Sequence, residues 1–157
     1  MADNRINPSA YWTGRIQPQV QRELDRGDSV LYLEGDPSSD RVLTGTDVRE
    51  LLALLMSHTK TNAVTELILA RNELDDDAAT AIAVALPNLH SLTELSLVEN
   101  KIGMIGAQAI AAAIPESTLR NVWLQGVTQG QAIDEAIFAG VVNKHGQAVE
   151  ITAQGMP

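Results

Sequence analysis

An eleven-residue pattern that occurs twice constrains this chain most strongly. Residues 64–74 read V-T-E-L-I-L-A-R-N-E-L, and residues 92–102 read L-T-E-L-S-L-V-E-N-K-I. The two copies start 28 residues apart, and the match continues beyond them, because Pro87 and Pro115 also lie 28 residues apart. A fixed period of this length predicts a stack of similar structural units.

Each unit divides into a strand half and a helical half. Alternation in the strand directs the first, fourth and sixth pattern positions into the core and the fifth to the opposite face. Alanine-rich runs at 78–86 and 107–114 predict helices, each ended by a proline. Asn72 and Asn100 follow the strands, and their amides carry both donors and an acceptor. We expect each to bond backbone groups of its own turn and of the neighbouring turn.

The pattern L-x-x-L-x-L-x-x-N-x-L resembles the leucine-rich repeat. A 28-residue unit with a full helix resembles the ribonuclease-inhibitor type of this repeat, over about residues 28–127. The resemblance implies an α/β fold, a short crescent-shaped solenoid with a parallel sheet on its concave side and helices on its convex side. Because the end units of a solenoid expose apolar surface, we expect a cap at both ends.

We divide the chain into an N-terminal arm and capping helix at 1–27, repeats at 28–147, and a terminal strand and tail at 148–157. Within the arm, we expect residues 1–15 to be irregular and Pro18 to Arg26 to form a short helix. The repeats divide at about 28–63, 64–91, 92–118 and 119–147.

The first and last repeats depart from the pattern. Asp36 takes the place of the asparagine in the first, and Asp47 is predicted to cap its helix, with Glu50 at the third helical position. Val127 takes the ninth position in the last repeat. There we expect a helix at 132–143, with its inner side formed by Ile133, Ile137, Phe138 and Val141.

Composition excludes several classes of function. The chain has no cysteine, which rules out disulfides, thiolate metal sites and cysteine nucleophiles. Its net charge of −9 argues against nucleic acid as a partner. The start is polar, and no apolar run is long enough to span a membrane. We therefore expect a cytoplasmic protein without membrane contact, with secretion into a host cell by a non-classical bacterial system as a further hypothesis.

Motifs for catalysis or metal binding are weak. Three aspartates at 75–77 offer carboxylates to a divalent cation, but acidic residues at a helix N-terminus more commonly cap it. His58, His90 and His145 occupy different phases of the repeat, which argues against a shared centre. Nucleophile-elbow, Walker-type and H-E-x-x-H motifs are missing. We predict no catalytic, cofactor-binding or metal site.

The outward face of the sheet is the candidate site. Its exposed apolar and aromatic residues, flanked by charges, are typical of a protein interface. The predicted partner-binding residues are Tyr32, Glu34, Glu66, Ile68, Arg71, Glu94, Ser96, Val98, Glu99, Asn121, Trp123 and Gln125.

The resemblance implies that this face binds a partner protein, whose identity is unknown. We predict a non-enzymatic interaction module that is a monomer. One alternative is a structural or truncated piece of a larger leucine-rich-repeat protein. Another is a non-catalytic subunit that regulates an enzyme. A bacterial effector that acts in a host cell is a further hypothesis.

Overall fold

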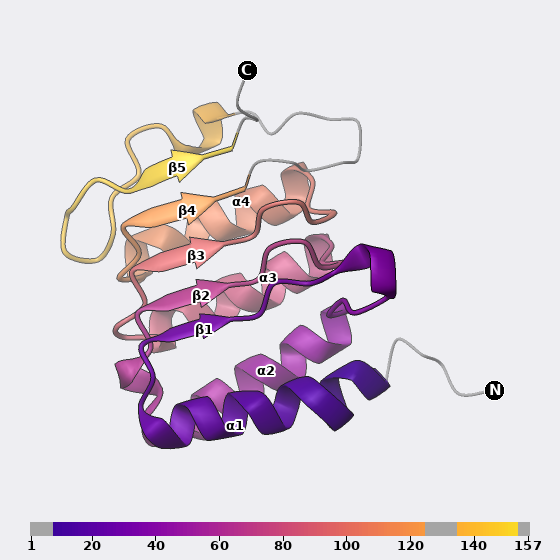
Figure 1. Cartoon of the computed structure of the whole chain (residues 1–157). Helices are drawn as coiled ribbons and strands as arrows, with labels where there is room; N and C mark the ends of the chain where they lie inside the picture. Colours follow the sequence, from indigo (N-terminus) through magenta and orange to yellow (C-terminus); the bar gives the residue numbers. More distant parts are fainter. Residues whose placement is uncertain (1–7, 125–134, 154–157) are drawn as a thin grey trace.

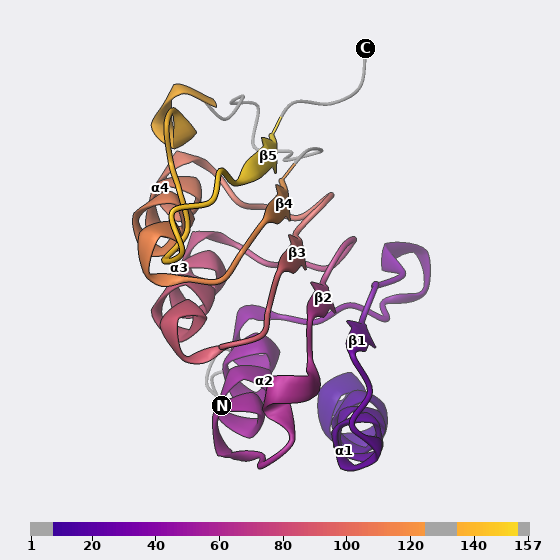
Figure 2. The ribbon, with the colours of Figure 1, turned by 90° about the vertical axis from the view of Figure 1, so that its left-hand side faces the viewer.

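Five parallel strands form one sheet in the order in which they occur along the chain, and helices lie on one side of it (Figures 1 and 2). The computed structural model describes residues 8–124 and 135–153. The helices behind the sheet are α2 (Gly45–Ser57), α3 (Asp76–Ala85) and α4 (Met104–Ala113). The strands are β1 (Val30–Tyr32), β2 (Glu66–Ile68), β3 (Glu94–Ser96), β4 (Asn121–Trp123) and β5 (Glu150–Thr152). This arrangement confirms the predicted α/β class.

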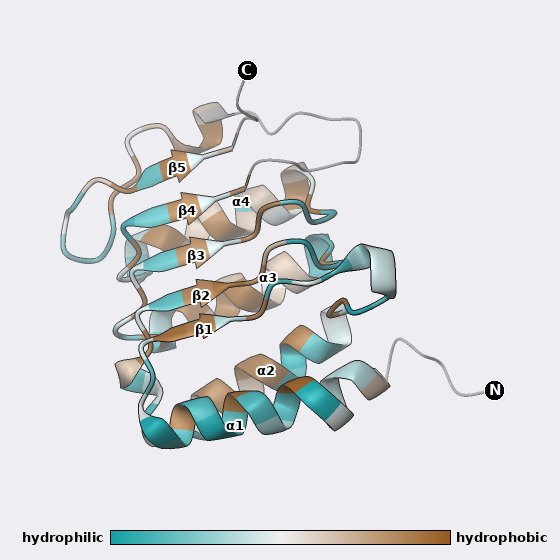
Figure 3. Ribbon diagram, in the orientation of Figure 1, coloured by the Kyte–Doolittle hydropathy of each residue, from teal (hydrophilic) through white to brown (hydrophobic). Residues whose placement is uncertain are grey.

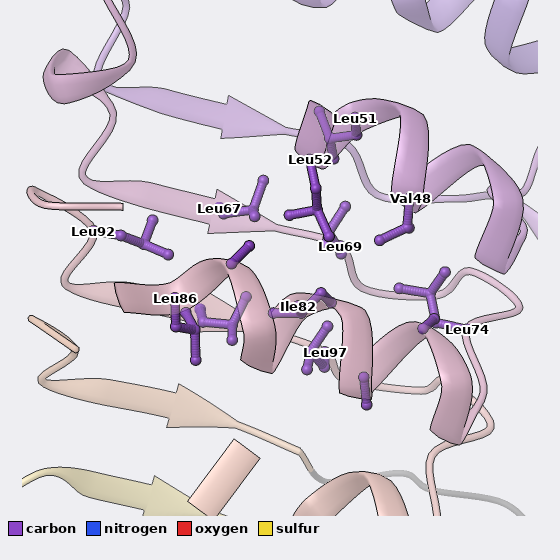
Figure 4. Packing of buried hydrophobic residues seen from close by; sticks show 14 of the residues in the cluster. Val48, Leu51, Leu52, Leu67, Leu69, Leu74, Ile82, Leu86, Leu92 and Leu97 are labelled. Carbon is purple, nitrogen blue, oxygen red and sulfur yellow. The ribbon is translucent and has the colours of Figure 1, made fainter. Parts of the chain in front are cut away.

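The core forms between the sheet and the helices. Leu67 and Leu95 are in register in neighbouring strands and are fully buried. Figure 4 shows Leu67 and Leu69 from β2 and the following turn directed toward the helical layer, which contributes Leu51 and Ile82. The first, fourth and sixth pattern positions are therefore inward, as predicted. Each unit buries its apolar strand face against its neighbours as well as against its own helix.

The pattern asparagines connect successive turns as predicted. The Nδ2 of Asn72 donates to the carbonyl of Leu69 in its own turn and to that of Leu33 in the preceding unit, at 3.0 Å in each case. Its Oδ1 accepts from the amide of Leu43 at 2.8 Å. Asn100 repeats this arrangement one unit later, with Nδ2 donating to Leu97 and Leu69 and Oδ1 accepting from Leu74.

In the first unit, the residue at the asparagine position makes a different set of hydrogen bonds. Asp36 is exposed, and its carboxylate accepts hydrogen bonds from Ser38 and Ser39 of the adjoining 3-10 turn η2 (Pro37–Ser39). These bonds stay within the turn. The close approach of the next unit instead depends on Gly35, where a Cβ atom would overlap the carbonyl oxygen of Arg71 and the Oδ1 of Asn72.

The N-terminal segment is more ordered than the sequence predicted. A helical segment begins at Ala10, passes through the π-helix η1 (Trp12–Ile16) and continues as α1 (Gln17–Arg26). Trp12 is only 1% exposed, and this apolar anchor explains why residues 10–15 are helical and not irregular. Helix α1 lies below β1, at the edge of the sheet (Figures 1 and 2). It covers the side of β1 that β2 leaves unpaired.

The assignment of Asp47 as the cap of α2 was wrong. Thr44 is the N-cap, and Asp47 is the third helical residue, which completes a capping box with it. Glu50 is exposed. The buried carboxylate of Asp47 also accepts from the amide and hydroxyl of Ser9, at 2.7 and 2.6 Å. The residue therefore joins the N-terminal segment to the first repeat.

The helix predicted at 132–143 was also wrong over its described part. Residues 132–134, with Ile133, lie outside the described residues, and the structure has only a short 3-10 helix, η6 (Glu135–Phe138). Gly140 has φ of +70°, and Val142 forms an antiparallel bridge with Ala148. A left-handed residue ends helical geometry, which the apolar spacing alone could not reveal. Phe138 is 7% exposed and belongs to the core, as expected.

We predict that Asn100→Ala costs about 1–3 kcal/mol of unfolding free energy, because it leaves buried backbone groups of two units without partners. Asp36→Ala should cost clearly less, because Asp36 is exposed and bonds only its own turn. Urea denaturation monitored by circular dichroism measures both. Equal losses for the two variants would contradict the different roles of these turns.

A second prediction concerns the contact between α1 and the end of α2. The Nε2 of His58 lies 2.8 Å from Oδ1 of Asp25, and Lys60 donates to the Asp25 carbonyl. The hydrogen bond to His58, and next that to Gln21, lowers the pKa of Asp25 below its usual 3.8. A lowered folded-state pKa contributes stability above the unfolded value, and acidification through the folded value removes it.

The variant Asp25→Asn should therefore be less stable than the parent protein near neutral pH, and the difference should shrink as the pH falls below the usual aspartate pKa of 3.8. Urea titrations of both proteins across this range measure the difference. Asp77→Asn, an exposed aspartate outside this contact, serves as the control. A difference that stays constant with pH would contradict the assignment.

Candidate protein-binding surface

Two rows of side chains cross the sheet face that no described helix covers. The strands pair in register, so residues at the same pattern position lie side by side. We call Glu66, Glu94 and Glu150, which begin β2, β3 and β5, the glutamate row. The fifth pattern positions form the second row, which we call the aromatic row: Tyr32, Ile68, Ser96 and Trp123. Figure 3 shows the starts of β2 to β5 as hydrophilic.

The aromatic row presents large side chains on fixed backbone. Tyr32 is 60% exposed, and Ile68 and Trp123 are half-buried. Ser96 is only 7% exposed because these larger side chains flank it on both neighbouring strands. The indole of Trp123 therefore stands on the open face, as the pattern predicted, whereas the core of β4 is formed by Val122.

A charged network lies beyond the carboxyl ends of the first strands. The guanidinium of Arg71 lies 3.4 Å from the carboxylate of Glu99 and 4.0 Å from that of Glu34. The hydroxyl of Tyr32 donates to Glu34, and this hydrogen bond raises the pKa of the tyrosine. Arg71 and Glu99 have φ of 58° and 55°. Exposed pairs like these contribute little stability.

The glutamate row has no such compensation. Glu66 and Glu94 are direct partners on adjacent strands, which places their Cα atoms about 4.8 Å apart. Among residues 8–124 and 135–153, neither carboxylate forms an ion pair. Like charges directly opposite one another in a sheet destabilise it. The two carboxylates therefore repel each other, and no basic side chain of the described residues pairs with them.

The structure brings most of the predicted site residues together on this face. Glu34 and Val98 are half-buried beside the rows, and the half-buried Asn121 lies in register between Glu94 and Glu150. Gln125 lies outside the described residues. The sequence analysis missed Val30, Glu150 and Thr152, which extend the two rows to the outer strands. The alternation in A-V-E-I-T at 148–152 was the signal that could have found the last two.

Two of the three aspartates at 75–77 accept hydrogen bonds from amides at helix starts. Asp75 accepts from the amide of Ala78 at 3.0 Å and so caps its own helix. Asp76 crosses to the next unit, where its Oδ1 accepts from the amides of Gly103 and Gly106 at 2.7 and 2.9 Å. A Cβ at Gly106 would lie 2.7 Å from that oxygen, so glycine leaves the room that this contact needs. The capping interpretation is confirmed for Asp75 and extends across repeats for Asp76.

A leucine-rich-repeat family model matches residues 63–83 and 88–111, which include β2 and α3 in the first segment and β3 and α4 in the second. The chain therefore contains leucine-rich repeats in these two segments. Domains of this kind are generally protein-interaction modules. The comparison with curated proteins found no match. Within the part of the chain that the structure describes, no helix has the length and apolar character needed to cross a membrane.

We predict that Glu94→Gln stabilises the protein, by about 0.2–1 kcal/mol, because it removes the repulsion from Glu66. The gain should be smaller when Glu66 is already glutamine, and added salt should reduce the coupling. A double-mutant cycle in urea measures it. Glu50→Gln on α2 is the control and should show no coupling with Glu66. Equal gains in both backgrounds would mean that the two carboxylates do not interact.

Proposed function

We propose that this protein is a non-enzymatic interaction module that binds a partner protein on the open sheet face. The observation that carries the proposal is the aromatic row, in which Tyr32 and Trp123 stand on the open face at opposite ends of four adjacent strands. Tyrosine and tryptophan are enriched among the residues that dominate binding energy at protein interfaces.

The backbone under the aromatic row supports this role. Strands β2, β3 and β4 are hydrogen-bonded on both sides, so binding requires little reorganisation of the surface. The charges of Glu34, Arg71 and Glu99 lie beside the aromatic row and suit the polar rim of an interface. An apolar centre with a charged border is the usual composition of a specific binding surface.

The ribonuclease-inhibitor subtype is part of this proposal. The 28-residue spacing supports it, as does the presence of a ten-residue helix in each of the two best-matched units. A monomeric state, a cytoplasmic location and a role as a bacterial effector stay predictions. Light scattering of the purified protein tests the first of these.

Trp123→Ala should separate binding from folding. The variant should lose clearly less stability than the about 3–5 kcal/mol expected for a truncated core tryptophan. It should weaken a partner by about 2 kcal/mol or more, because an anchoring ring is removed. Affinity capture with the folded protein identifies the partner, and calorimetric titration of the parent and variant measures the loss.

Two control variants make this test specific. Val84→Ala changes a 74% exposed residue on the helix side and should leave binding unchanged. Leu95→Ala removes a fully buried side chain of β3 and should cost about 2–5 kcal/mol of stability. A partner that binds Trp123→Ala as tightly as the parent, or that loses affinity for Val84→Ala, would exclude the open face as its site.

A further inference from the structure

The open face has a basic side chain paired with its carboxylates at one end of the strands but not at the other. At the carboxyl ends, Arg71 pairs with Glu34 and Glu99. At the opposite ends, the glutamate row forms no ion pair within the described ranges 8–124 and 135–153. Arg120, which precedes β4, is exposed and does not pair with it. A partner on this face therefore meets uncompensated carboxylates beside apolar surface.

We propose that the partner presents a basic segment to this face, with lysine or arginine side chains on the glutamate row and aliphatic side chains on the aromatic row. The inference rests on the proposed function and names the chemistry of the partner. An apolar or acidic partner would bury or repel the carboxylates of Glu66 and Glu94, which is strongly unfavourable. A cationic partner neutralises them and also relieves their mutual repulsion.

The spacing of the two rows fits an extended segment that crosses the strands. Glu66 and Ile68 are two residues apart in β2, which separates the rows by about 6.6 Å. Neighbouring strands lie about 4.8 Å apart, so the five strands span about 19 Å, the length of about six extended residues. Alternate side chains of an extended chain point in opposite directions. Alternating basic and aliphatic residues would therefore reach one row each.

The test uses fluorescence anisotropy with a labelled, capped hexapeptide of alternating lysine and leucine, added to the full chain at low salt. We expect binding that weakens as sodium chloride is raised, because the contacts are ionic. The double variant Glu66→Gln, Glu94→Gln should weaken binding by about tenfold or more. Both substitutions preserve side-chain shape, and circular dichroism verifies that the variant is folded.

The matched control carries the same change in net charge. Glu50→Gln with Glu116→Gln removes two exposed carboxylates from helical segments away from the strands, and it should bind the peptide within about twofold of the parent. Equal losses for the two double variants would show attraction to net charge alone and would overturn the proposed site. Absence of binding to the parent protein at low salt would overturn it as well.

Further probes separate this inference from the proposed function. Hexalysine, spermine and calcium ions should each bind more weakly than the lysine-leucine peptide, and equal affinity would mean that no aliphatic contact is made. If Trp123→Ala weakens the peptide while the Glu66 and Glu94 substitutions do not, the aromatic row binds but the basic segment is wrong. If only the glutamate substitutions weaken it, the charge pairing holds and the aromatic anchor of the proposed function fails.

Discussion

The hydrogen bonds of Asn72 and Asn100 are the interaction on which the rest of this structure depends. Where each strand ends, the chain turns away and leaves carbonyl and amide groups inside the stack without ladder partners. Each asparagine supplies donors to carbonyls of two successive units and accepts an amide with the same side chain. This contact fixes the offset between units. The register of the strands, and with it the alignment of the two surface rows, follows from that offset.

A second set of contacts holds the helical layer to the same spacing. Asp76 binds the first turn of the next helix through Gly103 and Gly106, and Asp47 binds Ser9 of the N-terminal segment. These carboxylates complement amides at helix starts, where the helix dipole favours negative charge. The units are thus tied to their neighbours on both sides of the core. Some of the acidic excess of the chain is structural and not available to a ligand.

The sequence was most informative where the repeat is intact. Inward leucines, turn asparagines and the outward position of Trp123 follow from one period and one alternation, and the structure has all three. Departures occur where a contact joins residues far apart in sequence. The bond from Ser9 to Asp47 spans 38 positions, and that from Asp76 to Gly106 spans 30. Local spacing carries no signal for such pairs.

At the C-terminal end of the stack, local spacing also failed to predict the structure, for another reason. Apolar residues at 133, 137, 138 and 141 have helical spacing, yet the left-handed Gly140 and the buried Asn143 direct the chain into a turn. Asn143 accepts from the amides of His145 and Gln147 and donates to the carbonyl of Leu119. It supplies to the last unit an amide contact like those of the pattern asparagines. The repeat pattern places its asparagine at the ninth position, so it could not predict the role of Asn143, which lies in a different part of the unit.

The residues of the open face are not those that would make the fold most stable. Stacking needs only the inward positions and the turns, so residues such as Glu66, Glu94 and Trp123 are free of the constraint that fixes Leu67 and Leu95. A free surface optimised for stability would not pair two glutamates across adjacent strands or place a half-buried indole beside them. Local rules are commonly broken where a surface serves a ligand. The combination of repulsive carboxylates and aromatic anchors on one rigid sheet is therefore best explained by a partner whose charge and apolar groups complement both.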